Sequence, residues 1–305
     1  MNKEFLDLAE QLKNSVTCTV RLDELMSGHT SFKIGGPADI LVLPESVEQL
    51  REVLKVVSKT AVPLTLLGNG SNVLVRDKGI RGIVIKLGNM LRNFCEAEDL
   101  LVFGAGYSLA LASYKAMECG KTGMEFAVGI PGSIGGAVYM NAGAYDGEMQ
   151  NIVHCVRVMD LHGNERILTA EDLNFGYRKT SLQNSGLIVT EVTLKMPSGN
   201  KAEIKSKMDD FSQRRVSKQP LEMPSAGSMF KRPPGYFAGT LIDEAGLKGY
   251  TVGGAQISTK HAGFVVNIGG ATAADVLQLI RDVQTKIKAG VGVELQPEVL
   301  VIGEE

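Results

Sequence analysis

The sequence has no tryptophan and few of the residues that hold metals or form disulfides. Its four cysteines, Cys18, Cys95, Cys119 and Cys155, include no Cys-x-x-Cys pair. None of the four histidines stands at zinc-ligand spacing from a cysteine pair. These absences exclude the usual zinc modules. They predict reduced, mostly buried thiols and no metal site.

Net charge and long apolar runs are also scarce. With a formal net charge of -2, the chain lacks the excess of positive charge that is typical of proteins that bind nucleic acid or an anionic membrane. No segment approaches the roughly 20 apolar residues that span a bilayer. The N-terminal stretch MNKEFLDLAEQLKN lacks the apolar core and cleavage site of a signal peptide. We therefore expect a cytoplasmic protein with no nucleic-acid or membrane partner.

Apolar runs and amphipathic helical stretches follow one another along most of the chain, which predicts an α+β fold. The pattern separates into three regions, residues 1–90, 91–200 and 201–305, which we expect to be three domains. Hydrophobic residues make up 44% of the chain, enough for a large core without disulfides or metal.

Capping signals mark two of the expected helices. Ser46 opens the first, with Gln49 placed for a capping box, and Thr272 opens the second, with Asp275 three residues on. Gly290 is the expected end of the second helix. A last strand is expected at 295–302.

Glycine, in contrast, is abundant: the chain has 35 glycines, and many of them are clustered. The first cluster is LGNGSN at 67–72. Small polar residues and glycines between two strands form either a nest of N–H groups for phosphate or a plain hairpin turn. The cluster leads into a strand rather than a helix, so it is no Rossmann loop, and the chain has no G-x-x-x-x-G-K-[ST] motif.

The second cluster, GIPGSIGGAVYMNAGAY at 129–145, has almost no charged or bulky residue. A loop of small residues packs poorly and costs backbone entropy, so we expect a flat, rigid cofactor to lie against it. A glycine-rich packing crossover is the alternative. The third cluster, at 246–254, fits a solvated turn or a loop that faces an anionic or polar ligand.

Ser228 lies in PSAGSMFKRPPG at 224–235, among small residues and just before Lys231 and Arg232. By itself the stretch indicates a tight turn that enters a buried strand at Met229-Phe230. Small residues around one hydroxyl, with two cations beside it, also suit a reactive serine.

Six segments together resemble one enzyme family. They are HTSFKIGGPAD (29–39), LGNGSNVLV (67–75), GIPGSIGGAVYMNAGAYDGEM (129–149), FGYRKTS (175–181), PSAGSMFKRP (224–233) and LQPEV (295–299). In this order, and over nearly the whole chain, they resemble the UDP-N-acetylenolpyruvoylglucosamine reductases, flavoenzymes of peptidoglycan precursor synthesis. The length is similar to that of the shorter form, which lacks an insertion in the third domain.

The resemblance implies a two-subdomain FAD-binding fold of the vanillyl-alcohol oxidase type, followed by a C-terminal α+β substrate-binding domain whose last strand returns toward the flavin. FAD would be bound without a covalent link. Its site would be formed by the two glycine loops, at Gly68, Asn69, Gly70, Ser71, Asn72, Gly129, Pro131, Gly132, Ser133, Ile134 and Gly136.

The resemblance also implies the reaction and its residues. NADPH would reduce FAD, and hydride from flavin N5 would then reduce the enolpyruvyl ether of UDP-N-acetylglucosamine enolpyruvate. Arg178 would hold the substrate carboxylate, Glu298 would stabilise the enolate, and Ser228 would donate the proton. Tyr177, Lys218 and Lys231 would contact the diphosphate or the nicotinamide ribose.

Alternatives remain at this point. Taken alone, Arg178 fits a surface arginine of a strand-end loop, and Glu298 fits a strand-edge carboxylate. His29 and His261 fit structural roles better than catalytic ones. An FAD-dependent oxidase of the same cofactor fold, acting on another substrate, and a non-catalytic UDP-sugar sensor are the two rival functions.

Overall fold

The computed structural model describes residues 3–87 and 92–305. The chain divides into two compact units, each built from three separate segments. Unit 1 comprises residues 1–22, 40–69 and 82–214, and unit 2 comprises residues 23–39, 70–81 and 215–305. The predicted domain boundary between residues 90 and 91 lies outside the described residues.

Helices and strands alternate through the described residues, which confirms the α+β class. The α-helices are α1 (Lys3–Ser15), α2 (Val47–Val57), α3 (Leu109–Glu118), α4 (Ile134–Tyr139), α5 (Lys201–Lys218), α6 (Ala238–Glu244) and α7 (Ala273–Val291). The strands are β1 (Thr19–Leu25), β2 (Pro37–Leu43), β3 (Leu64–Leu67), β4 (Val73–Val75), β5 (Ile80–Lys86), β6 (Phe94–Ala97), β7 (Leu100–Gly104), β8 (Gly143–Ala144), β9 (Gly147–Glu148), β10 (Val153–Met159), β11 (Glu165–Thr169), β12 (Ile188–Lys195), β13 (Ser225–Ser228), β14 (Thr251–Val252), β15 (Ala255–Ile257), β16 (Phe264–Asn267) and β17 (Leu300–Ile302). Short 3-10 turns span Met26–His29, Glu125–Ala127 and Met149–Asn151.

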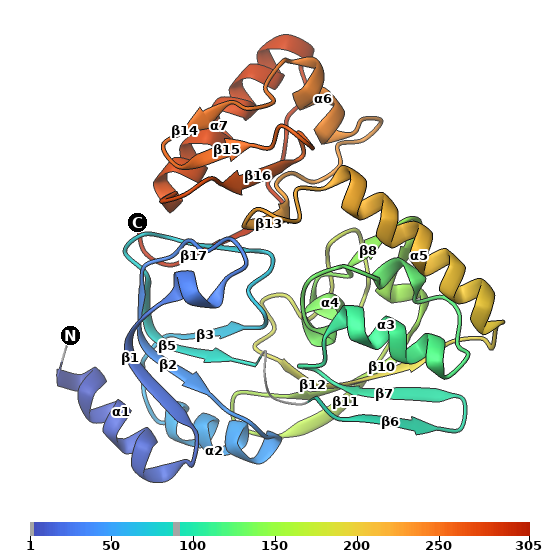
Figure 1. Ribbon diagram of the computed structural model, residues 1–305. Helices are drawn as coiled ribbons and strands as arrows, with labels where there is room; N and C mark the ends of the chain where they lie inside the picture. Colours follow the sequence, from blue (N-terminus) through green and yellow to red (C-terminus); the bar gives the residue numbers. More distant parts are fainter. Residues whose placement is uncertain (1–2, 88–91) are drawn as a thin grey trace. The chain divides into compact units, whose positions relative to one another are not determined.

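The first sheet has the strand order β1-β2-β5-β3, and α1 and α2 pack against it (Figure 1). Leu12 and Leu50 are fully buried in this core. Ser46 accepts the Gln49 N–H at 3.2 Å, so the predicted helix start is correct. The predicted capping box is not formed in full, because the Gln49 amide oxygen accepts the N–H of Glu45 at 2.7 Å instead.

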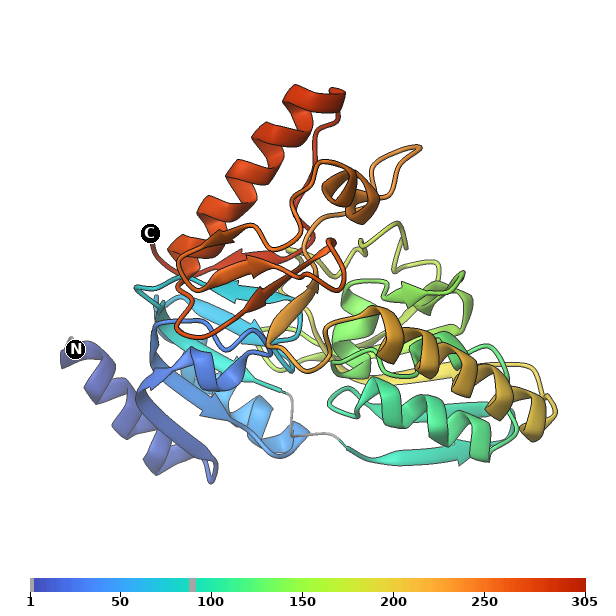
Figure 2. The ribbon, with the colours of Figure 1, turned by 45° about the horizontal axis from the view of Figure 1, so that its top comes forward.

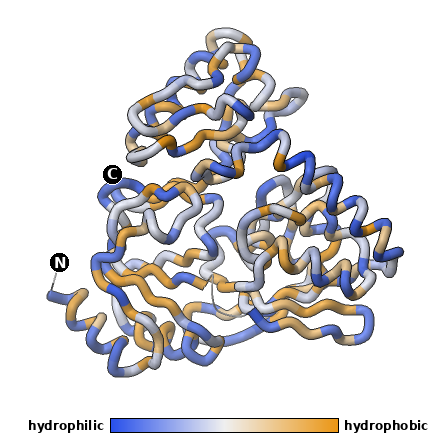
Figure 3. The backbone as a smooth tube through the Cα atoms, viewed as in Figure 1, coloured by the Kyte–Doolittle hydropathy of each residue, from blue (hydrophilic) through white to orange (hydrophobic). Residues whose placement is uncertain are grey.

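The second sheet of unit 1 is antiparallel throughout, with the order β11-β10-β12-β7-β6. Its strands are strongly apolar, whereas α5 carries long hydrophilic stretches (Figure 3). α3 and α4 cover one face, where Ile134 and Phe103 are fully buried. The sequence predicted a loop over 129–145, but this segment contains α4, because Ser133 caps a short run of small residues that fits against the sheet.

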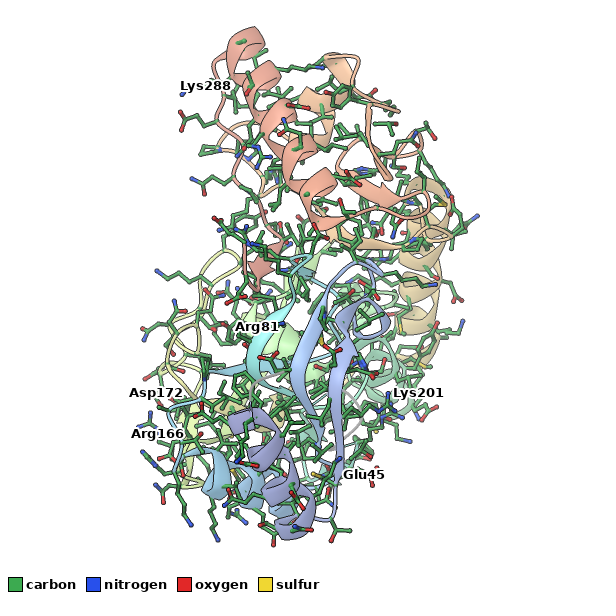
Figure 4. All side chains as sticks on the ribbon, turned by 90° about the vertical axis from the view of Figure 1, so that its left-hand side faces the viewer. Glu45, Arg81, Arg166, Asp172, Lys201 and Lys288 are labelled. Atoms are coloured by element: carbon green, nitrogen blue, oxygen red, sulfur yellow. The ribbon has the colours of Figure 1, made fainter. Side chains whose placement is uncertain are left out.

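The sheet of unit 2 has the order β13-β16-β15-β14 and is also antiparallel. α7 runs along this sheet and buries Val276, Leu279 and Val283 (Figure 2). β4 and β17 form a separate parallel pair. Arg81 and Asp39 of unit 2 form an ion pair at 2.6 Å (Arg81 is labelled in Figure 4).

The start of α7 agrees with the sequence, but its end does not. Thr272 and Asp275 form the predicted capping box, and the Asp77 carboxylate accepts the next two N–H groups, of Ala273 and Ala274. The helix ends at Gly292, not at Gly290, because Gly292 takes the left-handed conformation with φ 72°.

Two strand predictions are also wrong. The last strand covers only Leu300–Ile302, because residues before it pair with another segment, described below. In PSAGSMF the strand is Ser225–Ser228, and Met229 and Phe230 are buried residues that follow it.

The predicted burial of the cysteines is wrong as well. All four are free thiols, but Cys95 is exposed and the other three are half-buried. Within residues 3–87 and 92–305, no helix has both the length and the apolar character needed to cross a membrane. The same residues contain no cluster of three or more metal-ligating side chains.

Candidate active site

Ser133 is the centre of the glycine-rich segment in unit 1. It is 95% buried, caps α4 and accepts the Gly136 N–H at 3.3 Å. A Cβ atom on either Gly68 or Gly136 would lie 3.3 Å from its hydroxyl oxygen. The two glycine loops therefore meet at one hydroxyl, where a side chain on either glycine would crowd the oxygen.

The main chain around Ser133 is hydrogen-bonded to the turn between β7 and α3. The N–H of Ile134 donates to the Tyr107 carbonyl at 2.9 Å, and the N–H of Leu109 donates to the Gly132 carbonyl at 3.1 Å. Ser133 and Ile134 are buried, whereas the neighbouring Gly129, Pro131 and Gly136 are exposed. The exposed part of this segment thus consists mainly of glycine main chain, beside the ring of Pro131.

Such a surface fits the flat ring system and diphosphate of FAD. Main chain without side chains allows a planar group to approach closely, and exposed N–H groups suit phosphate oxygens. Gly68 and Asn69 belong to the same unit as this surface.

The remaining residues of the first glycine loop, Gly70, Ser71 and Asn72, belong to unit 2. The Asn72 amide donates to the Glu298 carbonyl at 3.3 Å, and its own carbonyl accepts the Leu300 N–H at 3.0 Å. These bonds continue into the β4–β17 pair. Asn72 therefore fastens the loop to the segment that carries Glu298.

Ser228 and Glu298 lie on two paired segments of unit 2. The Glu298 N–H donates to the Met229 carbonyl and the Lys231 N–H donates to the Gln296 carbonyl, both at 2.8 Å. Phe230 and Pro297 form the bridge between them. The structure thus brings together two predicted catalytic residues that are 70 positions apart in the sequence. Ser228 is exposed and Glu298 is half-buried, so both side chains are accessible.

The small residues before Ser228 have other roles than the sequence suggested. Ala226 is 99% buried in the core of unit 2, so its methyl group points inward. Gly227 has open space around its Cβ position, but its φ of 77° lies in the left-handed region. Backbone conformation, rather than access to the hydroxyl, is what requires glycine there.

The two predicted lysines differ in their surroundings. Lys231 is half-buried and three residues after Ser228, within the pairing to the Glu298 segment. Lys218 is exposed at the last residue of α5. Lys231 is therefore close in sequence to Ser228, the predicted proton donor, whereas Lys218 ends the helix α5.

Arg178 belongs to unit 1 and has an unusual backbone, with φ 56°. Its guanidinium donates to the carbonyls of Asn141 at 3.4 Å and Gly143 at 3.2 Å. It also lies 5.0 Å from the ring centre of Tyr177, whose side chain is exposed. Arg178 is the second residue of a two-residue turn that Gly176 and Lys179 close with two main-chain hydrogen bonds, and turns are where non-glycine residues most often take a positive φ.

His29 and His261 both have structural partners. His29 contacts the Glu24 carboxylate at 2.9 Å. The Nδ1 atom of His261 accepts the Gly263 N–H at 3.0 Å, and the ring meets Phe264 edge-on. Neither geometry points to catalysis.

Sequence reasoning missed two residues that organise these segments, Asn141 and Ser31. Asn141 supplies a carbonyl to Arg178. The Ser31 hydroxyl donates to the Ser225 carbonyl at 2.7 Å, and its N–H donates to the Gly70 carbonyl at 3.1 Å. Both residues stand inside the quoted motifs, but only the folded chain shows what they touch.

Comparison with known proteins gives the family. A family model described as UDP-N-acetylenolpyruvoylglucosamine reductase, C-terminal domain, matches residues 219–302. The UDP-N-acetylenolpyruvoylglucosamine reductase of Clostridium perfringens strain 13 is 50% identical to this chain over 302 residues, 99% of this chain and 98% of that protein. The chain belongs to the UDP-N-acetylenolpyruvoylglucosamine reductase family. The reductase of Caldanaerobacter subterraneus is 49% identical over 284 residues, 93% of this chain and 94% of that protein.

Two further comparisons agree with the fold described above. A model described as FAD binding domain matches residues 38–169. The crystal structure of the Thermus caldophilus UDP-N-acetylenolpyruvylglucosamine reductase superposes with a TM-score of 0.79 at 38% identity, and the match covers 94% of this chain and 99% of that one. The predicted fold class, an FAD-binding fold followed by a C-terminal α+β domain, is confirmed.

Proposed function

We propose that this protein reduces UDP-N-acetylglucosamine enolpyruvate to UDP-N-acetylmuramate with electrons from NADPH. The observation that carries the proposal is the 50% identity, over 99% of the chain, to a protein named for this substrate class. The exposed main chain around Ser133 supports it, because that surface fits FAD. Bound FAD would accept two electrons from NADPH and supply them as hydride to the substrate.

The glycine loops would hold the cofactor in this proposal. The first loop would contribute residues 68–72, and the second would contribute Gly129, Pro131, Gly132, Ser133, Ile134 and Gly136. Residues 1–90 and 91–200 would form the two FAD-binding subdomains, and residues 201–305 would bind the substrate.

Three side chains would complete the chemistry. Arg178 would bind the enolpyruvyl carboxylate, because a guanidinium matches a carboxylate with two parallel hydrogen bonds. The Ser228 hydroxyl would give its proton to the substrate carbon next to the carboxylate. Glu298 would stabilise the enol form of the intermediate, whose O–H can donate to the carboxylate. The pairing of its segment with the Ser228 segment supports this role.

Binding of the diphosphate or of the nicotinamide ribose falls to Tyr177, Lys218 and Lys231 in this proposal. The placement of Lys231 beside the paired segments of Ser228 and Glu298 favours it over Lys218 as a diphosphate contact.

Anaerobic half-reactions test the proposal. Purified protein loaded with FAD is reduced with NADPH, and UDP-N-acetylglucosamine enolpyruvate is then added. We expect the flavin absorbance to return with formation of UDP-N-acetylmuramate. Reduced protein that stays reduced with this substrate would overturn the assignment. Reoxidation by oxygen alone would favour an oxidase, and protein that retains no flavin would favour a sensor.

We also propose that the reaction takes place in the cytoplasm, where nucleotide-linked sugars and NADPH occur. Cell fractionation with a tagged full-length protein tests this location. Recovery of the protein with the envelope fraction after a salt wash would contradict it.

A further inference from the structure

We propose that Asn141 is a positioning residue that holds Arg178 toward the carboxylate of the substrate. This inference rests on the proposed function, because it assumes that Arg178 binds the enolpyruvyl carboxylate. Its structural support comes from one hydrogen-bond network within unit 1. All of its members lie between residues 139 and 183.

Asn141 forms hydrogen bonds with the main chain of Gly176 and with the side chain of Arg178. Its main-chain carbonyl accepts one guanidinium N–H of Arg178 at 3.4 Å. Its side-chain amide donates to the carbonyl of Gly176, two residues before Arg178, at 3.0 Å. One residue therefore restrains the main chain of the arginine loop and the tip of the arginine side chain.

The Asn141 side chain is itself held by two further partners. Its amide donates to the Glu148 carboxylate at 3.1 Å, and its amide oxygen accepts the Gln150 N–H at 3.0 Å. The residue is fully buried. Because donors and acceptors are all matched, the amide has one orientation, and a group of similar size without the amide cannot replace it.

Backbone conformation adds a second, independent observation. Both Asn141 and Arg178 have left-handed φ values, 42° and 56°. Asparagine accepts this conformation readily, but for arginine it is costly. At Arg178 the turn closed by Gly176 and Lys179 enforces it, and the Asn141 amide donates to the Gly176 carbonyl of that turn. Gln183 contributes to that enforcement by donating to the carbonyls of Arg178 and Tyr139.

The expected consequence is a specific loss of carboxylate binding. A guanidinium that loses its support samples several orientations, and misplacement by about 1 Å costs on the order of 10–100-fold in rate. The effect should therefore fall on the step that uses the substrate carboxylate and spare the reduction by NADPH.

Calorimetric binding gives the first test, with a readout other than activity. Asn141→Ala should weaken binding of UDP-N-acetylglucosamine enolpyruvate about tenfold, because the charge-assisted hydrogen bonds from Arg178 to the carboxylate are weakened. Binding of UDP-N-acetylglucosamine, which has no enolpyruvyl carboxylate, should change less than twofold. Equal weakening of both ligands would overturn the proposal, because it would indicate general damage to the site.

A double-mutant cycle gives the second test. Arg178→Lys removes the fork that Asn141 orients, so adding Asn141→Ala to it should slow flavin reoxidation by substrate little further. Additive effects would show that Asn141 does not act through Arg178. If Arg178→Lys alone leaves substrate binding unchanged, the role proposed for Arg178 fails and the inference about Asn141 fails with it.

Thr190→Val is the matched control for stability. Thr190 is buried in β12 of the same unit and donates one hydrogen bond, to the Arg157 carbonyl at 3.2 Å. It should lower the melting temperature without changing the ratio of the two ligand affinities. A change of that ratio in Thr190→Val would mean that lost stability alone explains the effect of Asn141→Ala, and the proposal would be rejected. If Asn141→Ala does not fold, Gln183→Ala tests the same support from the loop side, and unchanged affinity for the enolpyruvyl ligand would contradict it.

Discussion

Left-handed backbone at non-glycine residues gathers around the proposed carboxylate site. Asn141, Tyr145 and Asp146 have φ values of 42°, 50° and 63°, and Arg178 has 56°. Each such residue costs on the order of 1–3 kcal/mol unless the surroundings favour it. Tyr145 and Asp146 form the two-residue turn between β8 and β9, a turn type that needs left-handed residues. At Arg178 a tight turn and the Asn141 network act together. At the scale of single residues, turn geometry and hydrogen bonds therefore hold the left-handed residues near the proposed site.

Ser228→Ala tests the proton donor. Because Ser228 is exposed and is the last residue of the strand β13, the substitution should leave folding unchanged. Loss of a general acid typically slows the step that uses it by about 10²–10⁴-fold. Stopped-flow measurement should show slow reoxidation by substrate and normal reduction by NADPH.

Ser225→Ala, in the same strand, is the matched control and should behave as the unmodified protein. The proton-donor role of Ser228 would be abandoned if Ser228→Ala slowed reoxidation no more than a few-fold.

His261 gives a prediction for stability against pH. Burial lowers the pKa of the imidazole below its ordinary value, and Nδ1 accepts the Gly263 N–H, which only a neutral ring can do. Between the folded pKa and about 6.5, the unfolded chain binds more protons than the folded one. The neutral His261 ring therefore makes its full contribution to the free energy of unfolding above about pH 6.5. This contribution is lost as the pH falls from there through the pKa of His261 in the folded protein.

Urea unfolding at pH 7.5, 6 and 5 measures this dependence. His261→Gln should flatten it, whereas His162→Gln, at an exposed turn position, should leave it as it is. An unchanged pH dependence in His261→Gln would contradict the prediction.

At the scale of elements, the glycines have two distinct uses. Inside α4, Gly135 lets the helix contact the main chain of Ala105: its N–H donates to the Ala105 carbonyl at 2.9 Å. Near the end of α7, Gly290 has no heavy atom within 4 Å of its Cβ position. The first glycine is required by packing, and the second is not.

Matched alanine substitutions test this difference. A Cβ atom on Gly135 would lie 2.8 Å from the Ala105 Cβ, so Gly135→Ala should destabilise the fold by about 1–3 kcal/mol through overpacking. Gly290→Ala should stabilise it by up to about 1 kcal/mol, because alanine favours the helix. Chemical denaturation gives both values. Two changes of the same sign would refute the distinction.

At the scale of the molecule, each unit has its own apolar core. Unit 1 contains two sheets with their helices, and unit 2 contains one sheet with α6 and α7. The core of unit 2 combines Phe32, Leu74 and Leu279, which come from its three chain segments. Neither unit is therefore a continuous stretch of sequence.

Removal of FAD should lower the stability of the protein and loosen some segments more than others. A ligand that binds only the folded protein stabilises it by about 2.7 kcal/mol at a free concentration of 100 Kd. We expect flavin-free protein to melt at lower temperature. Hydrogen exchange should increase in peptides over 129–136, where main chain is exposed.

α7 serves as the internal reference for that experiment, since its buried face packs within the core of unit 2. The assignment of 129–136 to the cofactor would be wrong if these peptides kept their protection after flavin removal, or if α7 lost as much as they did.

The sequence alone determined the features that depend on near neighbours. The starts of α2 and α7 follow from Ser46 and Thr272, because a cap is a bond between residues three positions apart. The buried stripe of α7 follows from apolar spacing. The motifs, each a short run of letters, were enough to indicate the family. The end of α7 was misplaced because two glycines, Gly290 and Gly292, suit the same local rule.

Only the tertiary structure decided which distant residues meet. The pairing of the Glu298 segment with the Ser228 segment, the support of Arg178 by Asn141, and the exposure of Cys95 depend on how strands and loops are placed. Contacts across dozens of residues are set by topology and by the need to satisfy buried donors and acceptors. A short sequence pattern does not contain those constraints. Arg178, Ser228 and Glu298 were therefore predicted only through the resemblance to a family. The contacts of Asn141 and Ser31 became apparent only in the folded structure.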